Sequence, residues 1–487
     1  MTARETPNVV VIVMDTARAS EIGSRTAPAL TALGADGTRF TDAHATAPWT
    51  LPSHGSLFTG LYPSKHGAHA EHERLDDTYP TIAELLGEAG YETVAVTNNT
   101  WVTPEAGFDR GFDTFRKAWQ YLPGDGNMLW EMVQIRDESR LRGLARSVID
   151  GNPIRNTINA VYSRYLYGRE DDGANRTVSW IDDWLTEREN DDPFFLFANF
   201  IEPHLDYEPP EEYAERFLPE GVSYDDAMSI EQDPWEFLVG NTNHSGEEFA
   251  TLRALYRASI AYLDDQIDRL RDSLEEAGEW EDMVFVVMGD HGENIDDQEL
   301  MDHQYCLYDT LLNVPLVIHG GPFDGGGRNN EYVSLLDLAP TLLDVAGIDA
   351  EDARSAFQGR SVHPDADTEP PETLFAEYMA PQPTMAALEQ HTGKLPEHVT
   401  RFDRSLRSIR ADSYKLIRGS DGSRELYHVA EDPGEQHDLS DEIPERVDEL
   451  EKGLDDWLQS FDHAESSGEI DISGERKRQL EELGYLQ

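Results

Sequence analysis

Short runs of apolar, mostly β-branched residues recur along the first 350 positions, and segments with helical spacing lie between them. The run at 8–14, NVVVIVM, is unbroken, which is typical of a parallel strand buried on both faces. Further strands are predicted at 92–97, 194–200, 283–288 and 314–318, and helices at 26–37, 79–90, 247–277 and 334–345. This alternation predicts an α/β fold with a mostly parallel central sheet flanked by helices.

The pattern changes twice along the chain. Residues 118–192 are polar and rich in Arg and Trp, and we expect them to form a helical insertion in a main domain over 1–350. Beyond this domain, short strand-like runs are separated by turn residues, at 374–378, 405–410, 414–417 and 425–428. They predict a small C-terminal antiparallel α+β subdomain over 351–460, followed by an acidic polar tail over 461–487.

The charge balance narrows the possible partners. The chain has 96 acidic and 39 basic side chains, a formal net charge of −57, and only six of the bases are lysines. A field of this sign disfavours binding to nucleic acid or to anionic lipid. Diffuse acidity with little lysine resembles haloarchaeal proteins, whose molar salt shortens the Debye length to about 3 Å. An acidic mesophilic protein is the alternative.

The cysteine content and the hydropathy of the sequence indicate where in the cell the protein is expected. The single cysteine, Cys306, excludes an internal disulfide and a multi-thiolate metal site, and it is more typical of a small buried apolar residue than of a nucleophile. No apolar run approaches the ~18 residues of a membrane span. Residues 1–7 lack the apolar core of a signal peptide, so the sequence predicts a cytoplasmic protein without a membrane partner. The oligomeric state is not indicated.

Carboxylate and imidazole side chains follow two of the predicted strands. Asp15 ends the first, and Asp290 and His291 come directly after 283–288, between two glycines. Functional residues of open α/β sheets gather at carboxyl ends of strands, and these side chains are suitable ligands for a divalent cation. The alternatives are a capping role for Asp15 and an ordinary surface turn at Asp290 and His291.

A third candidate is Thr50, at the start of a helix predicted over 52–60. A hydroxyl at a helix N-terminus lies among free backbone N–H groups and the positive end of the helix dipole. This environment suits a nucleophile that attacks an anionic ester. The alternative is that Thr50 only caps the helix.

Together, these segments resemble the sulfatase branch of the alkaline phosphatase superfamily. The resemblance is carried, in the family's order, by NVVVIVMDTARA, TLPSHGSLFTGLYPSKHG, FFLFANFIEPHLDYEPP, YRASIAYLDDQIDRL with VFVVMGDHGE, and SIRADSYKLI with ELYHVAEDPGEQHDL. It implies an alkaline-phosphatase-like catalytic domain over 1–350 and metal-dependent cleavage of a small anionic ester.

The resemblance also implies roles for individual residues. The metal ligands would be Asp15, Thr50, Asp290 and His291, with Thr50 also the nucleophile. His204 and Lys415 would contact the bound sulfate or phosphate and, with Thr50 and His54, would be the catalytic residues. His303 and Arg18 are further substrate-binding candidates. Asp206 and Glu293 are possible additional ligands. The ion would be Mn²⁺, Zn²⁺, Mg²⁺ or Ca²⁺, and the number of ions is left open.

Three departures from the family pattern affect the predicted substrate. Sulfatases of this family convert a Cys or Ser at the nucleophile position to formylglycine, which Thr50 cannot become. His54 stands where the motif has Arg, and Thr16 where calcium-binding sulfatases often have Asp. Threonine nucleophiles are typical of superfamily members that act on phosphoric esters. The sequence thus favours phosphodiester or phosphomonoester hydrolysis, with a sulfate-ester hydrolase, a phosphoryl transferase or an inactive binding protein as alternatives.

Overall fold

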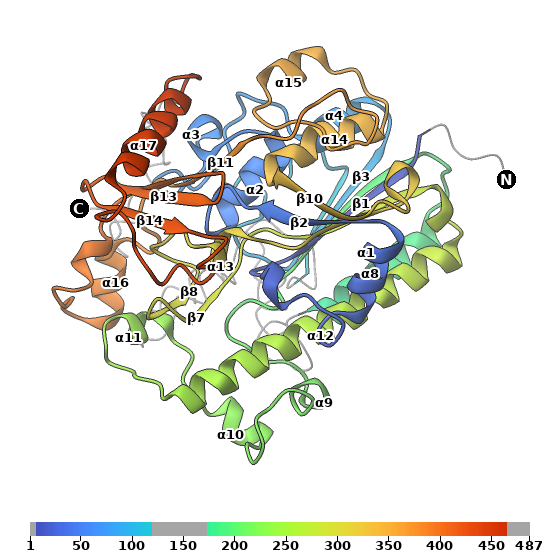
Figure 1. Ribbon diagram of the computed structural model, residues 1–487. Helices are drawn as coiled ribbons and strands as arrows, with labels where there is room; N and C mark the ends of the chain where they lie inside the picture. Colours follow the sequence, from blue (N-terminus) through green and yellow to red (C-terminus); the bar gives the residue numbers. More distant parts are fainter. Residues whose placement is uncertain (1–5, 119–172, 465–487) are drawn as a thin grey trace, which may run out of the picture.

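An eight-stranded sheet forms the centre of the computed structural model, which describes residues 6–118 and 173–464 (Figure 1). The strand order is β10-β2-β9-β6-β1-β5-β3-β4. The strands are β1 (Asn8–Met14), β2 (Thr38–His44), β3 (Glu92–Thr97), β4 (Thr114–Lys117), β5 (Phe194–Phe200), β6 (Met283–Gly289), β9 (Leu316–His319) and β10 (Gly327–Ser334). Every residue of β1, β5 and β6 is buried, as their unbroken apolar sequences predict.

The strand directions bring the carboxyl ends of several strands to the same edge of the sheet. β1 pairs in parallel with β5 and β6, and β3 pairs in parallel with β4 and β5. Among the described strands of this sheet only β9 is reversed, because it pairs antiparallel with both β2 and β6. The segments that follow β1, β3, β5 and β6 therefore meet at a single edge.

Helices cover both faces of the sheet. One face packs against α1 (Pro28–Asp36), α8 (Ala174–Glu187) and the long α12 (Gly246–Ala277). The other packs against α2 (Thr50–Thr59), α4 (Ile82–Glu88) and α14 (Leu338–Val345) (Figure 1). Shorter helices are α3 (Pro63–His66), α9 (Glu211–Ala214), α10 (Tyr224–Met228), α11 (Pro234–Leu238), α13 (Asp309–Leu312), α15 (Glu351–Ala356) and α16 (Met385–Thr392).

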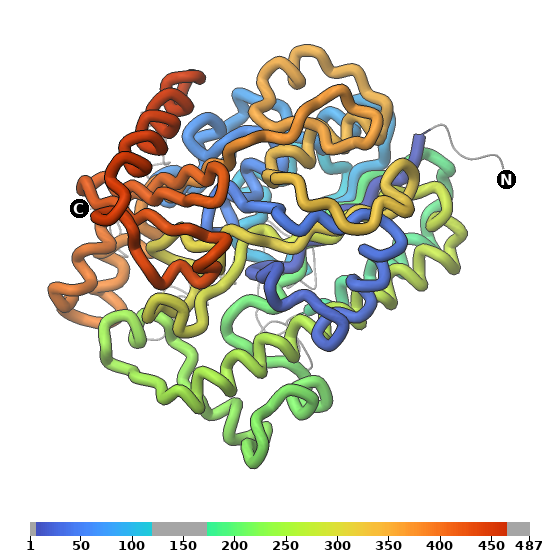
Figure 2. Tube along the Cα trace, viewed as in Figure 1, coloured from blue at the N-terminus to red at the C-terminus, as the bar shows by residue number. Residues whose placement is uncertain are grey.

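A second sheet of four antiparallel strands lies beside the first. Its order is β11-β12-β13-β14, and α17 (Pro444–Leu458) covers one of its faces. The strands are β11 (Thr373–Tyr378), β12 (Leu406–Ala411), β13 (Tyr414–Gly419) and β14 (Arg424–His428). Figure 2 shows these orange and red segments against the rest of the chain. A small hairpin of β7 (Asn294–Asp297) and β8 (Leu300–Asp302) follows the end of β6.

The α/β fold with its C-terminal antiparallel sheet is thus confirmed. Most of the predicted insertion at 118–192 lies outside the described residues, and so does most of the tail at 461–487. Cys306 is buried, beside the amide of Asn294. None of the described helices combines the length and the hydropathy that a membrane span requires.

Candidate active site

Four side chains converge where β1, β6 and α2 meet. Asp15 follows β1, Asp290 and His291 follow β6, and Thr50 is the first residue of α2. All four are buried, with at most 2% of each residue exposed. The Ser53 hydroxyl donates to the carbonyl of Asp290 over 2.6 Å, which ties the first turn of α2 to the end of β6. The structure therefore brings together the four residues predicted as metal ligands.

Thr50 does not act as a helix cap. Trp49 occupies the cap position, and no side chain there accepts a hydrogen bond from the helix. The Thr50 Oγ1 atom lies 3.3 Å from Nε2 of His291 and accepts a hydrogen bond from Nδ2 of Asn99, also at 3.3 Å. The hydroxyl thus points into the site, as a nucleophile would.

His291 is oriented as a ligand. Its Nδ1 atom lies 3.0 Å from the Gly292 carbonyl, which fixes Nδ1 as the protonated nitrogen. The unprotonated Nε2 then lies 3.7 Å from Oδ1 of Asp15 and 3.5 Å from Oδ2 of Asp290. Gly292 is required here, because a Cβ atom would lie 2.0 Å from the carbonyl oxygen of Thr310.

The carboxylates retain free coordination positions. Oδ1 of Asp290 accepts the backbone N–H groups of Thr16 and His291, whereas Oδ2 of Asp290 and Oδ1 of Asp15 have no hydrogen-bond partner among the described residues. Burial and repulsion from Asp290 raise the pKa of Asp15 well above its usual value. Two buried carboxylates, each with an oxygen that lacks a hydrogen-bond partner among the described residues, lie beside an unprotonated imidazole nitrogen and fit a divalent cation.

The His54 side chain is fully buried and contacts the first turn of α2. Its Nδ1 atom donates to the Thr50 carbonyl over 3.0 Å, and Nε2 lies 3.4 Å from Nδ2 of Asn199. Burial lowers the pKa of His54, although the charge of Asp290 opposes the shift. Since both ring nitrogens have protein partners, His54 positions the first turn of α2 as a neutral group.

A second group of buried residues adjoins the first. His303 Nδ1 lies 2.5 Å from Oδ1 of Asp302 and 3.5 Å from Oε1 of Glu293. The ring centroids of His291 and His303 are 4.6 Å apart, and that of His204 is 5.1 Å from His303. Burial alone would lower the pKa of His303, but the ion pair with Asp302 raises it well above its usual value. His303 therefore adjoins His291, one of the predicted metal ligands, and His204 adjoins His303.

Arg18 and Lys415, which were predicted to contact the substrate, form ion pairs with other residues of the chain. The Arg18 guanidinium lies 2.5 Å from Asp297 and its backbone N–H donates to the Tyr256 hydroxyl, so it supports the turn after β1. Lys415 is buried, with its Nζ atom 2.7 Å from Asp309 and 2.8 Å from Glu435. Asp206 is exposed, unlike the four converging ligands.

Replacing Lys415 with alanine should reduce stability more than activity. The change leaves the Asp309 and Glu435 carboxylates without their shared cation, and removing one partner of a buried pair costs about 3–5 kcal/mol of unfolding free energy. Thermal unfolding measures this cost, with Lys65→Ala at a half-buried lysine as control. An unchanged midpoint together with a raised KM would instead indicate a direct contact with the substrate.

Three site residues have only weak signals in the sequence. Asn99 follows β3 and bonds both Asp15 and Thr50. Asn199 is in β5 and contacts His54. Asp302 precedes His303 and contacts its ring. Position after a strand would have suggested Asn99, but Asn199 lies within an apolar run and Asp302 within an acidic stretch.

The chain is similar to characterised sulfatases and to a phosphonate hydrolase. It is 25% identical to the arylsulfatase of Clostridium perfringens, with 96% of this chain and 98% of that protein aligned. It is 25% identical to the choline-sulfatase of Rhizobium meliloti, covering 77% and 74%. The crystal structure of the phosphonate monoester hydrolase of Agrobacterium radiobacter superposes with a TM-score of 0.68 at 21% identity, covering 93% of this chain and 96% of that one.

Family models give the same assignment. The model described as sulfatase matches residues 7–348, and that of the C-terminal part of N-sulphoglucosamine sulphohydrolase matches 297–463. Since the first covers more than half of the chain, the protein belongs to the sulfatase family of ester hydrolases.

Proposed function

We propose that the protein hydrolyses phosphodiesters or phosphomonoesters in preference to sulfate esters, with unmodified Thr50 as the nucleophile. The observation that carries the proposal is the position of the Thr50 hydroxyl among the predicted metal ligands, 3.3 Å from His291. A threonine in this place supplies an alcohol nucleophile without prior oxidation to an aldehyde. The ligands would be Asp15, Thr50, Asp290 and His291, a set that suits Mn²⁺, Zn²⁺ or Mg²⁺.

The reaction would proceed in two displacements. When bound, the cation lowers the pKa of the Thr50 hydroxyl and offsets negative charge on the ester. The Thr50 hydroxyl loses its proton to solvent and its Oγ1 forms a bond to phosphorus while the bond to the leaving alcohol breaks, and His204 donates a proton to the leaving oxygen. Water then attacks the phosphorus, the bond from phosphorus to Thr50 Oγ1 breaks, and a proton from the water restores the Thr50 hydroxyl. Asn99 holds the Thr50 hydroxyl in line, and His54 holds its backbone.

A sulfate ester is the second candidate substrate. The matched relatives named arylsulfatase and choline-sulfatase favour it, whereas the phosphonate monoester hydrolase shows that the fold also accommodates phosphorus chemistry. Transfer of a phosphoryl group to an alcohol and binding without turnover are retained as less favoured alternatives.

A rate panel separates these candidates. Aryl sulfate, aryl phosphate, bis-aryl phosphate and aryl phosphonate would be compared in molar salt with Mn²⁺, Zn²⁺, Mg²⁺ and Ca²⁺ in turn. We expect one of the phosphorus esters to give the highest kcat/KM. Sulfate turnover above every phosphorus ester would reverse the preference, and product transfer to an added alcohol would indicate a transferase.

We further propose that the protein is adapted to high salt and to the cytoplasm. With a net charge of −57, self-repulsion is long-ranged in dilute buffer and is screened within about 3 Å at 1 M salt. The unfolding midpoint should rise steeply with KCl concentration between about 0.1 and 1 M, as thermal scans would show. A midpoint that is independent of salt would contradict the halophilic adaptation and leave the site unaffected.

A further inference from the structure

Glu293, Asp302 and His303 form a second cluster of potential ligands, and we propose that it binds a second divalent cation. One ligand atom from each residue lies within 4.8 Å of the others. The cluster adjoins the Asp15 group but shares no residue with it. The inference goes beyond the proposed function, because it depends neither on the type of ester nor on Thr50 as nucleophile.

Glu293 is the residue that most requires a cation. It is fully buried, and neither of its carboxylate oxygens has a hydrogen-bond partner among the described residues. Its nearest basic atom in the cluster is Nδ1 of His303, 3.5 Å from Oε1. An ionised carboxylate is strongly disfavoured in such a place unless a positive charge compensates it.

His303 does not supply that charge by itself. Its Nδ1 atom is 2.5 Å from Oδ1 of Asp302 and so a full ångström closer to Asp302 than to Glu293. Asp302 is already satisfied, because Oδ1 also accepts the His303 backbone N–H and Oδ2 accepts Nε2 of Gln304. A divalent cation in place of the proton between His303 and the carboxylates would be bound by both acids and by the imidazole, a ligand set that Mn²⁺ and Zn²⁺ accept.

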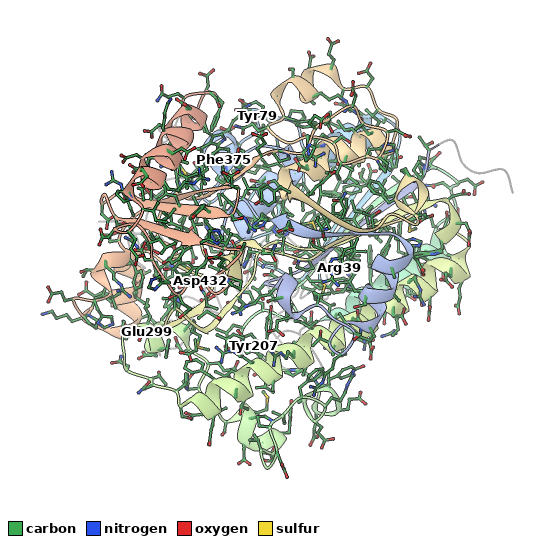
Figure 3. All side chains as sticks on the ribbon, in the orientation of Figure 1. Arg39, Tyr79, Tyr207, Glu299, Phe375 and Asp432 are labelled. Carbon is green, nitrogen blue, oxygen red and sulfur yellow. The ribbon has the colours of Figure 1, made fainter. Side chains whose placement is uncertain are left out.

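A further unsatisfied group lies nearby. Tyr207, labelled in Figure 3 on the α12 side of the sheet, is fully buried and stacks edge-on with Tyr256 of α12. The Tyr207 hydroxyl has no hydrogen-bond partner in the described structure, and it lies within electrostatic range of Glu293. Unpaired polar atoms from two segments thus border the same buried region, as expected around an ion or its bound water.

Metal content of the full-length protein tests the proposal. Metal-free protein would be incubated with Mn²⁺ and passed over a desalting column. Elemental mass spectrometry would then give the number of Mn²⁺ ions bound per chain. The wild-type chain should bind two ions, and Glu293→Gln and Asp15→Asn should each bind one. The double variant should bind none. Glu377→Gln, at a buried glutamate that binds Arg407 instead, is the matched control and should retain both ions.

The outcomes distinguish this proposal from the assignment of the first site. A wild-type chain that binds a single ion, lost in Asp15→Asn and retained in Glu293→Gln, would overturn the second site and keep the first. Unchanged content in Glu293→Gln would also overturn it. If Glu293→Gln does not fold by circular dichroism, Asp302→Asn takes its place, with the same loss of one ion expected. Anomalous diffraction from Mn²⁺ would locate each ion independently of activity.

Discussion

Thr50→Ala should lower kcat by roughly 10⁴-fold or more on every ester that the protein cleaves, a size typical for the loss of a catalytic nucleophile. The substitution removes the oxygen that would form the covalent intermediate and one proposed metal ligand, while the backbone of α2 keeps its hydrogen bond to His54. Single-turnover kinetics would measure the loss. Mass spectrometry of quenched wild-type reactions should find the esterified Thr50 peptide.

Two further variants make this prediction specific. Thr50→Ser keeps a hydroxyl and should retain part of the turnover. Thr59→Ala removes a threonine from the last turn of the same helix, where its hydroxyl only donates to the Gly55 carbonyl, and should be close to wild type. Near wild-type rates in Thr50→Ala would exclude the covalent mechanism.

The sequence predicted those site residues that follow strong strands. Asp15, Asp290 and His291 come directly after β1 and β6, whose short, mostly β-branched apolar runs favour buried strands over helices. Parallel pairing of these two strands, residue for residue from Asn8 and Met283, then brings their carboxyl ends to the same place. Strand topology fixes where these three residues lie, so the residue pattern predicted their position, whereas their role as ligands was implied by the family resemblance.

Other parts of the fold depend on tertiary context. β2 and β10 carry polar residues at many positions and were not predicted, because β10 is the edge strand and β2 is its neighbour, and several positions of both strands are only partly buried. The strand predicted at 314–318 forms β9, which begins two residues later than expected, and its antiparallel direction has no signal in its composition.

Lys415 illustrates why side-chain roles were harder to predict than positions. A scarce lysine in a family-like segment suggested an anion contact, but its counter-charges come from Asp309 and Glu435, far away in the sequence. Asn99 was not predicted, because a neutral amide has no distinctive signal in the sequence. Its role becomes visible only in its contacts with Asp15 and Thr50. Long-range pairing of this kind is set by packing and has no local sequence signature.

Asp290→Asn should reduce kcat/KM by on the order of 10³-fold and weaken metal binding, because a divalent cation contributes several kcal/mol to transition-state stabilisation. Asparagine has nearly the same shape, and its carbonyl can still accept the N–H groups of Thr16 and His291, so the fold should persist. What is lost is the negative charge at Oδ2, the oxygen that has no hydrogen-bond partner among the described residues. Chelation of the wild-type enzyme should reproduce the loss, and added metal should reverse it there but not in the variant.

The matched control is Asp264→Asn in α12. Asp264 is also buried and also accepts two backbone N–H groups, those of Ala29 and Leu30, yet it belongs to neither candidate metal group. Its substitution should therefore leave metal affinity and turnover close to wild type. Equal losses in both variants would attribute the effect to the fold, and unchanged metal content and rate in Asp290→Asn would remove Asp290 from the site. A loss confined to Asp290→Asn would show that the carboxylate charge at the end of β6 is what the reaction requires.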